Sequence, residues 1–437
     1  MKLRLSKLIE FQIYYLLIIE SLISIVGIPS ITRYLLDVNL ILMAALSMQK
    51  IPFLFKHREY NRLTGYIIFY MVAVTAVAFI RLVPTGQILW GIRNNFFFIF
   101  FFFICIDNLK SKDVDRIMKN VVRLQIYNVV CILVEFIFMH KRNDLLSGMF
   151  GTEYGGNAYL NIYLTVICAY CFVGYIQKKV KQYVLISVIL SSIVVATFSE
   201  IKFFFFELAA ILIIPTLFSS KGSVVKRLAA VALGLAGLYL GFKVFSIVQS
   251  DSMEHMTSFE SIIEYNSRTI YGKNDIAISR LTAISQVNDY FFQDNTLNKL
   301  IGYGLGACES SKTFKWCHSN FATMYEDTGY RNRSTAMIYL ETGYIGLILF
   351  VGIFVFIIAI ALKSKRKKEY SNYATFTLIM SVISLFNFVY NSSLRIEIAY
   401  LIFFSLATLF IKIREQKTTE VKIKAEVKIP KTKKAAV

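Results

Sequence analysis

The N-terminal stretch MKLRLSKLIEFQIYYLLIIESLISIVGI, residues 1–28, decides the fold class of this chain. It starts basic and turns apolar, and its apolar run is long enough to cross a bilayer, which takes about 20 residues. Because the stretch lacks a small-residue cleavage site, we interpret it as an uncleaved first transmembrane helix, not as a removable signal peptide.

Apolar runs of this kind recur along the 437 residues, of which 56% are hydrophobic and 15% aromatic. A soluble domain has an apolar share of about 45–50%, so lipid is the main solvent of this protein. The sequence therefore predicts an all-α, polytopic transmembrane bundle of about 12 spans. The spans are predicted at 11–28, 31–48, 65–83, 88–106, 124–140, 158–177, 182–198, 201–218, 228–248, 336–362, 373–390 and 396–412.

The net charge of +20 raises the question of a nucleic-acid partner. The basic residues, however, fall in short clusters between the apolar segments, and the segments predicted to face the cytoplasm hold 32 of the 48 Lys and Arg. The positive-inside rule produces this arrangement. We therefore expect no nucleic-acid partner, and we place both termini in the cytoplasm.

The sequence predicts four parts of the chain, one of which is a long loop before the tenth span. These parts are spans one to nine (1–248), an extracytoplasmic loop (249–336), spans ten to twelve (337–412) and a disordered, basic cytoplasmic tail (413–437). Function concentrates in such structured loops.

The extracytoplasmic loop contains apolar residues at spacings of three or four, which predict an amphipathic helix on the outer membrane interface. They are Ile278, Leu281, Ile284, Val287 and Phe291. The stretch SMEHMTSFESIIEY (252–265) predicts a second helix of this kind, less clearly.

The stretch GYGLGACESSKTFKWCHSN (302–320) has an unusual concentration of Gly, Cys and His. Its glycines do not form a dinucleotide fingerprint and no strand–helix unit surrounds them, so we interpret them as sites of tight turns or close backbone approach. Cys308 and Cys317 are either bridged by a disulfide or free thiols. A Cys-x8-Cys-His spacing is not that of a zinc site, and we expect no metal and no cofactor.

His318 lies outside the membrane among polar residues and is either a general base or a solvated loop histidine. Glu309 is a second candidate for the base.

Ionisable residues in and beside apolar spans are costly and often functional. The topology brings several of them to one cationic cavity that faces outward and suits an anionic lipid headgroup, since Arg and Lys bind phosphate through charge-assisted hydrogen bonds. The alternative is snorkelling to the interface, which we favour for Arg395. The residues concerned are Arg81, Arg93, Glu200, Lys202, Arg280, His318, Arg331, Arg333, Arg395 and Glu397.

Other polar and aromatic residues are open to two interpretations. Glu20, Asp37 and Glu135 lie within spans and are expected to tie helices together. The aromatic residues of the loop either line a groove that stacks on sugars or form an interfacial belt. They are Tyr290, Phe291, Phe292, Phe314, Trp316, Tyr325 and Tyr330.

Four stretches carry a resemblance to a known family. They are SGMFGTEYGGNAYLNIYL (147–164), SEIKFFFFELAAILI (199–213), LIGYGLG (300–306) and STAMIYLETGYIGLILFVGIF (334–354), the last with a helix-entry pattern at Leu340, Glu341, Gly343, Ile345 and Gly346. In order and topology they resemble the O-antigen polymerase and ligase superfamily of polytopic membrane proteins.

The resemblance implies transfer of a glycan from an undecaprenyl-pyrophosphate carrier at the outer face of the bacterial cytoplasmic membrane, without metal or nucleotide. By analogy, Lys202 contacts the pyrophosphate and Arg280 holds the leaving phosphate. Ligases of this family often carry His-Asn about eleven residues before the glycine that is Gly343 here, whereas this chain has Asn332-Arg333. That departure counts against a ligase.

We therefore predict a polymerase of lipid-linked repeat units for capsular, exopolysaccharide or O-antigen chains. Its expected partners are the undecaprenyl-pyrophosphate-linked oligosaccharide, membrane lipid and a chain-length regulator protein. The alternatives are a ligase of the same superfamily and a flippase or other transporter. The predicted catalytic residues are Arg280 and His318, and the predicted pyrophosphate-binding residues are Lys202, Arg81, Arg93, Arg331 and Arg333.

Overall fold

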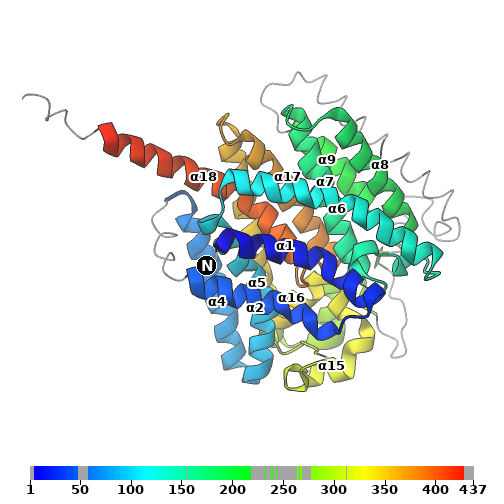
Figure 1. The fold of residues 1–437 in the computed structure, drawn as a ribbon. Coiled ribbons are helices and arrows are strands. Elements are labelled where there is room, and N and C mark those ends of the chain that lie inside the picture. The colour runs from blue at the N-terminus through cyan, green and yellow to red at the C-terminus, as the bar shows by residue number, and fades with distance from the viewer. Residues whose placement is uncertain are drawn as a thin grey trace, which may run out of the picture.

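The computed structural model describes residues 4–47, 58–153, 155–217, 277–311 and 313–427, with eight further positions between 232 and 267. Every regular element in these ranges is a helix (Figure 1). The longer helices are α1 (Leu5–Ser21), α2 (Leu35–Ser47), α4 (Arg58–Ile80), α5 (Thr85–Asn108), α6 (Ser111–Ile137), α7 (Gly156–Ile176), α8 (Gln182–Phe198), α9 (Phe203–Leu217), α16 (Ser334–Lys365), α17 (Ser371–Tyr390) and α18 (Ala399–Val427).

Eight helical stretches among the described residues are long and apolar enough to cross a membrane. They are α1 and α2, each with its adjoining turn, and α4, α5, α6, α7, α16 and α17. Helices α8 and α9 are apolar but shorter. Of the other predicted spans, the twelfth corresponds to the first part of α18, and the ninth, at 228–248, lies mostly outside the described residues.

The outer surfaces of these helices are apolar, as expected for a multi-pass membrane protein. Exposed side chains include Val72 (62% exposed) and Ile80 (73%) on α4, and Ile126 (74%) on α6. The interior, by contrast, holds polar groups such as Gln12, which donates to the Leu36 carbonyl at 3.2 Å. Backbone and side-chain polar groups must be satisfied internally where no water reaches them.

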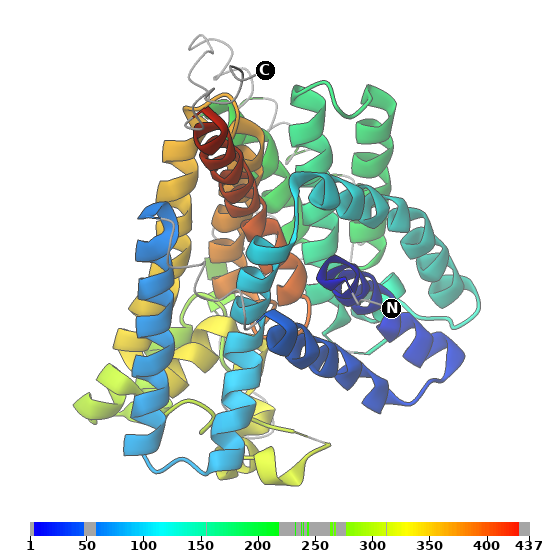
Figure 2. The ribbon, with the colours of Figure 1, turned by 60° about the vertical axis from the view of Figure 1, so that its left-hand side comes forward.

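Helices α4, α5, α16 and α18 run side by side in one half of the molecule, and the α1–α2 hairpin lies at a steep angle to them (Figure 2). Aromatic rings fill the contact between α5 and α18, where Phe98 and Tyr400 have ring centroids 4.8 Å apart and those of Phe102 and Phe410 are 5.4 Å apart. These edge-to-face pairs stabilise the packing beyond the area they bury.

Two of the acidic residues within spans tie helices together, as the sequence predicts. Glu20 on α1 pairs with Arg33 at 2.6 Å, and Asp37 on α2 pairs with Arg93 of α5 at 3.0 Å. Glu135 on α6 accepts instead from the backbone N–H groups of Ser147 and Gly148, at 3.1 and 2.8 Å. It therefore anchors the loop that leads into α7.

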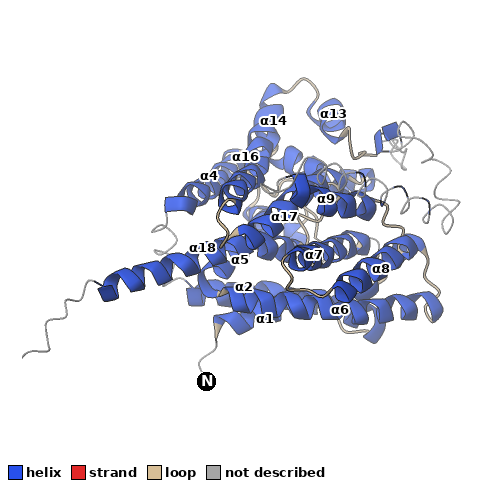
Figure 3. Cartoon of the chain, turned by 90° about the horizontal axis from the view of Figure 1, so that it is seen from above, coloured by secondary structure: helices blue, strands red, loops and turns tan. Residues whose placement is uncertain are grey.

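Two segments predicted to be non-helical are helical. Helix α6 begins at Ser111, so it includes residues 111–123 of the basic segment between the fourth and fifth predicted spans, which was predicted to face the cytoplasm. Helix α18 continues to Val427 and projects away from the bundle (Figures 1 and 3), so residues 413–427 of the predicted disordered tail form a helix. The charged residues in both segments are good helix formers, but their low hydropathy hides them from a search for spans. Residues 428–437 lie outside the described part.

The predicted extracytoplasmic loop, called the outer loop below, is described from residue 277 on except for residue 312, and this segment packs onto α16 as short helices. The amphipathic helix predicted from Ile278 to Phe291 is shorter and consists of α13 (Ala283–Val287) and a π-helical turn (Asn288–Phe292). Its apolar side packs against α16, where the Tyr339 hydroxyl donates to the Asn288 side chain at 2.7 Å. The predicted helix at 252–265 lies almost wholly outside the described residues.

Candidate functional site

The glycine-rich stretch docks the outer loop against α16 and α5. The N–H groups of Tyr303 and Gly304 donate to the Leu340 and Glu341 carbonyls at 2.8 and 2.9 Å, and the N–H of Gly306 donates to the Glu341 carboxylate at 3.0 Å. Gly302, Gly304 and Gly306 all have positive φ (73°, 102° and 90°), which glycine adopts without strain. The glycines therefore allow the backbone of the outer loop to contact the backbone of α16.

Arg395 lies at the centre of a buried ion-pair cluster. Its guanidinium donates to Glu309 of the outer loop, and it lies 3.3 Å from the carboxylate of Glu341 on α16. Asn94 on α5 donates to the second oxygen of Glu309 at 2.9 Å. Arg395 is only 7% exposed, so the interpretation that it snorkels to the interface is wrong. It holds the outer loop, α5 and α16 together.

Arg93 forms a second cluster beside the first. Its guanidinium pairs with Asp37 at 3.0 Å and with Glu397 at 2.7 Å, and the Tyr159 hydroxyl also donates to Glu397. The same guanidinium lies 5.1 Å from the ring centroid of Trp90. Helices α2, α5 and α7 thus meet the segment that precedes α18.

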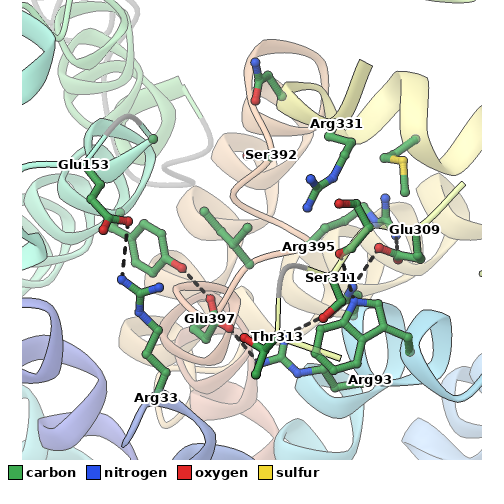
Figure 4. A pocket seen from close by; sticks show the side chains of 18 of the residues that line it. Arg33, Arg93, Glu153, Glu309, Ser311, Thr313, Arg331, Ser392, Arg395 and Glu397 are labelled. Atoms are coloured by element: carbon green, nitrogen blue, oxygen red, sulfur yellow. Dashed lines mark hydrogen bonds and ion pairs between the residues drawn. The ribbon is translucent and has the colours of Figure 1, made fainter. Parts of the chain in front are cut away.

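These clusters border a cavity of about 540 Å³, called here the central cavity (Figure 4). In Figure 4, Arg33 and Glu153 lie on one side of it and Arg331, Glu309 and Arg395 on the other. Its lining contains four arginines and five glutamates, so it is not the cationic cavity predicted from the sequence. They are Arg33, Arg93, Arg331 and Arg395, and Glu20, Glu153, Glu309, Glu326 and Glu397.

A second cavity of about 420 Å³, called here the apolar groove, lies between α9 and α17. Lys202 and Arg280 are the charged members of its lining, and most of the other lining residues are apolar. The rings of Phe203 and Tyr390 stack with centroids 3.9 Å apart, and the Arg280 guanidinium lies 4.5 Å from the Tyr390 centroid. Arg280 therefore lies against this aromatic stack, whereas Lys202 precedes Phe203 in the chain and its ammonium lies 3.4 Å from a carboxylate oxygen of Glu200. The remaining lining residues are Phe206, Ile263, Asn266, Leu281, Leu385, Phe386 and Val389.

The two cavities approach each other at the start of α7 and the end of α17. Gly156 and Ser392 line the central cavity, whereas Tyr390 lines the groove. Asp144 lies nearby and accepts a hydrogen bond from Asn157 at 2.8 Å. Burial and the charge of Glu200 raise the pKa of Asp144, and Lys202 and Arg280 oppose this increase. The positive charges of Lys202 and Arg280 thus partly offset the increase in the pKa of Asp144, which lies in the segment beside the central cavity.

The structure divides the predicted site residues into three groups. Arg93 and Arg331 line the central cavity, and Lys202 and Arg280 line the apolar groove. The other three line neither cavity: Arg81 donates to Asn298 at 2.8 Å, Arg333 donates to the Asn332 carbonyl at 2.9 Å, and His318 contacts the Ser310 and Thr323 hydroxyls at 3.3 and 3.1 Å.

Sequence reasoning missed Arg33, Tyr34 and Trp90 in the lining of the central cavity. Arg33 and Trp90 both sit near the predicted outer ends of spans, as Arg93 does. Their common predicted depth in the membrane could have indicated that these residues belong to one site. Depth alone, however, does not reveal which residues face one another.

Cys308 and Cys317 are free, buried thiols, so the disulfide alternative is not what the structure shows. Burial raises the pKa of both thiols, which makes them poor nucleophiles. Among the described residues, no three or more His, Cys, Asp and Glu side chains gather in a way that could hold a metal ion.

We expect all six cysteines to react with iodoacetamide when the purified protein is denatured without reductant, because all six are free in the structure. Intact-mass measurement counts the added groups. A pair of cysteines that reacts only after reduction would contradict the arrangement of Cys308 and Cys317.

No protein-family model matches the chain, and no curated protein is similar to it in sequence. The inference of function therefore depends on the two cavities, on their residues and on the resemblance described under Sequence analysis.

Proposed function

We propose that the protein is a metal-independent polymerase of undecaprenyl-pyrophosphate-linked oligosaccharide repeat units. The observation that carries the proposal is the apolar groove, whose lining contains both Lys202 and Arg280 together with the Phe203–Tyr390 aromatic stack. A lipid pyrophosphate needs these two features together, since its isoprenoid chain requires an apolar surface and its phosphates require cations.

The proposal implies a particular location. The chain crosses the bacterial cytoplasmic membrane about 12 times with both termini in the cytoplasm, and both cavities lie toward the outer face. A chain-length regulator protein is the expected protein partner, and no cofactor takes part.

In the proposed reaction, a hydroxyl of the acceptor sugar attacks the anomeric carbon of the carrier-linked sugar. A new glycosidic bond forms, the bond from that carbon to the pyrophosphate oxygen breaks, and the pyrophosphate leaves with the electron pair. Lys202 and Arg280 stabilise its developing negative charge. The acceptor proton passes to a carboxylate of the central cavity. Glu309 lines that cavity and His318 does not. To accept the proton, Glu309 must exchange its contact with Arg395 or Asn94 for the acceptor hydroxyl.

The test replaces Lys202 or Arg280 by alanine in the native host and measures polymer by gel electrophoresis of cell-surface carbohydrate. We expect the rate of polymerisation to fall by about 100-fold or more, as when one electrostatic donor to a developing anion is removed. The matched controls are Lys181→Ala and Arg142→Ala, exposed cations outside both cavities, which should leave the polymer unchanged. Normal chain length in both K202A and R280A, with each protein present in the membrane, would overturn the proposal.

The kind of material that accumulates separates this proposal from its alternatives. Loss of a polymerase leaves single repeat units at the cell surface, and loss of a ligase leaves long chains still bound to the carrier. Loss of a flippase leaves single repeats on the cytoplasmic side, where an external glycosidase does not reach them.

A further inference from the structure

The charges that line the central cavity are already paired. Arg33 pairs with Glu20 at 2.6 Å and Arg331 with Glu326 at 2.9 Å. Arg93 and Arg395 each have two carboxylate partners, as described above. Each of the four arginines in the described lining thus has a carboxylate partner, and an incoming anion would have to displace one.

The most accessible charges of the lining are carboxylates. The side chains of Glu153 and Glu326 are 79% and 43% exposed, and those of Arg331 and Arg33 are 37% and 31% exposed. The side chains of Arg93 and Arg395 are only 13% and 6% exposed. Because the lining also holds five glutamates against four arginines, the mouth of the cavity has a small excess of negative charge, which repels anions and attracts cations.

One wall of the central cavity is aromatic. The half-buried rings of Tyr34 and Trp90 lie with centroids 6.2 Å apart. The Trp90 indole N–H donates to the Ser310 carbonyl at 3.3 Å, and the Arg93 guanidinium lies against the ring. The indole is thus held in place, and flat apolar faces of this kind pack against the C–H faces of sugar rings.

We propose that the central cavity binds uncharged or amine-bearing sugars of the acceptor glycan and rejects uronic acids. This inference rests on the proposed function and specifies its substrate class. A neutral sugar places its hydroxyls among the paired arginine and glutamate side chains, which offer both donors and acceptors. An amino group is drawn to Glu153 and Glu326, whereas a uronate carboxylate meets them with like charge.

Tryptophan fluorescence can report binding in this cavity, because the chain has only two tryptophans. Trp90 lines the central cavity, and Trp316 is 61% exposed and lines neither cavity. The variant Trp316→Phe leaves Trp90 as the single tryptophan, which can be excited selectively over the tyrosines. The experiment titrates purified W316F with chitotetraose (neutral), with the tetramer of glucosamine (amine-bearing) and with tetragalacturonate (acidic), and it follows Trp90 fluorescence.

We expect chitotetraose and the glucosamine tetramer to change the fluorescence of Trp90, and tetragalacturonate to bind at least about tenfold more weakly. Adding Glu326→Gln should strengthen tetragalacturonate binding about fivefold or more and weaken binding of the glucosamine tetramer, because it removes a carboxylate and frees Arg331. The matched control is Asp327→Asn, a neighbouring exposed carboxylate outside the cavity lining, which should leave both affinities unchanged.

Two outcomes overturn the inference: tetragalacturonate binding as tightly as the other tetramers, or Trp90 responding to none of the three. The polymer measurement tests the polymerase proposal and the fluorescence titration tests the selectivity of the cavity, so either claim can fail without the other. If K202A and R280A make normal polymer but W316F selects neutral and amine-bearing sugars, the polymerase proposal fails and the selectivity of the cavity stands. If polymer is lost but W316F prefers tetragalacturonate, only the present inference fails.

Discussion

Replacing Arg395 by leucine is expected to lower the free energy of unfolding by about 3–5 kcal/mol, because removal of one partner of a buried ion pair leaves uncompensated charge. Here the substitution would strand two carboxylates, Glu309 and Glu341, which are 3% and 1% exposed. It would also remove one of the links from the outer loop to α5 and α16. Thermal unfolding of the purified variant in detergent, followed by circular dichroism, measures the effect.

Two controls separate the loss of the ion pair from a general effect of the substitution. Arg142→Leu removes an exposed arginine that donates to backbone carbonyls and lies over the Phe136 ring at 3.8 Å. Because this substitution strands no buried carboxylate, it should lower the midpoint much less than R395L does. The triple variant R395L/E309Q/E341Q carries no stranded charge and should recover part of the loss. A single variant R395L that unfolds at the wild-type temperature would show that the cluster does not stabilise the fold.

The contacts of Arg395 explain why the sequence-based prediction that it snorkels to the interface was wrong. Hydropathy locates Arg395 at the outer end of the twelfth predicted span, where snorkelling is the ordinary outcome for a long basic side chain. Its partners are Glu309 in the outer loop and Glu341 on α16, and no local pattern connects residues so far apart in the chain. The ion pairs with Glu309 and Glu341 offset the cost of burying the charge of Arg395, and these tertiary contacts exist only in the folded chain.

Helices that are apolar throughout were predictable from the sequence. The predicted span at 182–198 coincides with α8 (Gln182–Phe198), and the one at 373–390 differs from α17 (Ser371–Tyr390) by two residues at its start. Hydropathy detects such helices because lipid-facing and core-facing residues are both apolar. It fails at residues 111–123 of α6 and 413–427 of α18, where charged residues continue a helix beyond its apolar part.

The candidate site was predictable only in part. The resemblance suggested that Lys202 and Arg280 act together, and the structure brings both to one groove. The predicted topology placed Arg93 and Glu397 near the same ends of their spans, and in the structure they form an ion pair. Topology does not show which charges neutralise one another, so the sequence predicted a cationic cavity where the structure has arginines paired with glutamates. Lys and Arg are counted easily along a chain, whereas their pairing is a property of the fold.

Replacing Gly306 by alanine is the second substitution with a large expected effect. A Cβ at this position would lie 2.5 Å from the carbonyl carbon of Gln87, with the carbonyl oxygen nearer still. The neighbouring Gly91 leaves no room on the other side of the contact, since its own Cβ would lie 2.7 Å from the Gly306 nitrogen. Both obstacles are backbone atoms of α5 or of the loop, so no side-chain rotation relieves the clash.

Overpacking of this kind costs about 1–3 kcal/mol and occasionally more, and the positive φ of 90° adds about 1–2 kcal/mol for any residue with a Cβ. Gly155→Ala is the matched control, because Gly155 also has a positive φ (101°) but nothing within 4 Å of a Cβ. We expect G306A to lower the thermal midpoint clearly more than G155A does. Both variants place a Cβ at a positive φ, but only G306A brings that Cβ against the backbone of Gln87. Equal midpoints would therefore contradict the close backbone contact between the loop and α5.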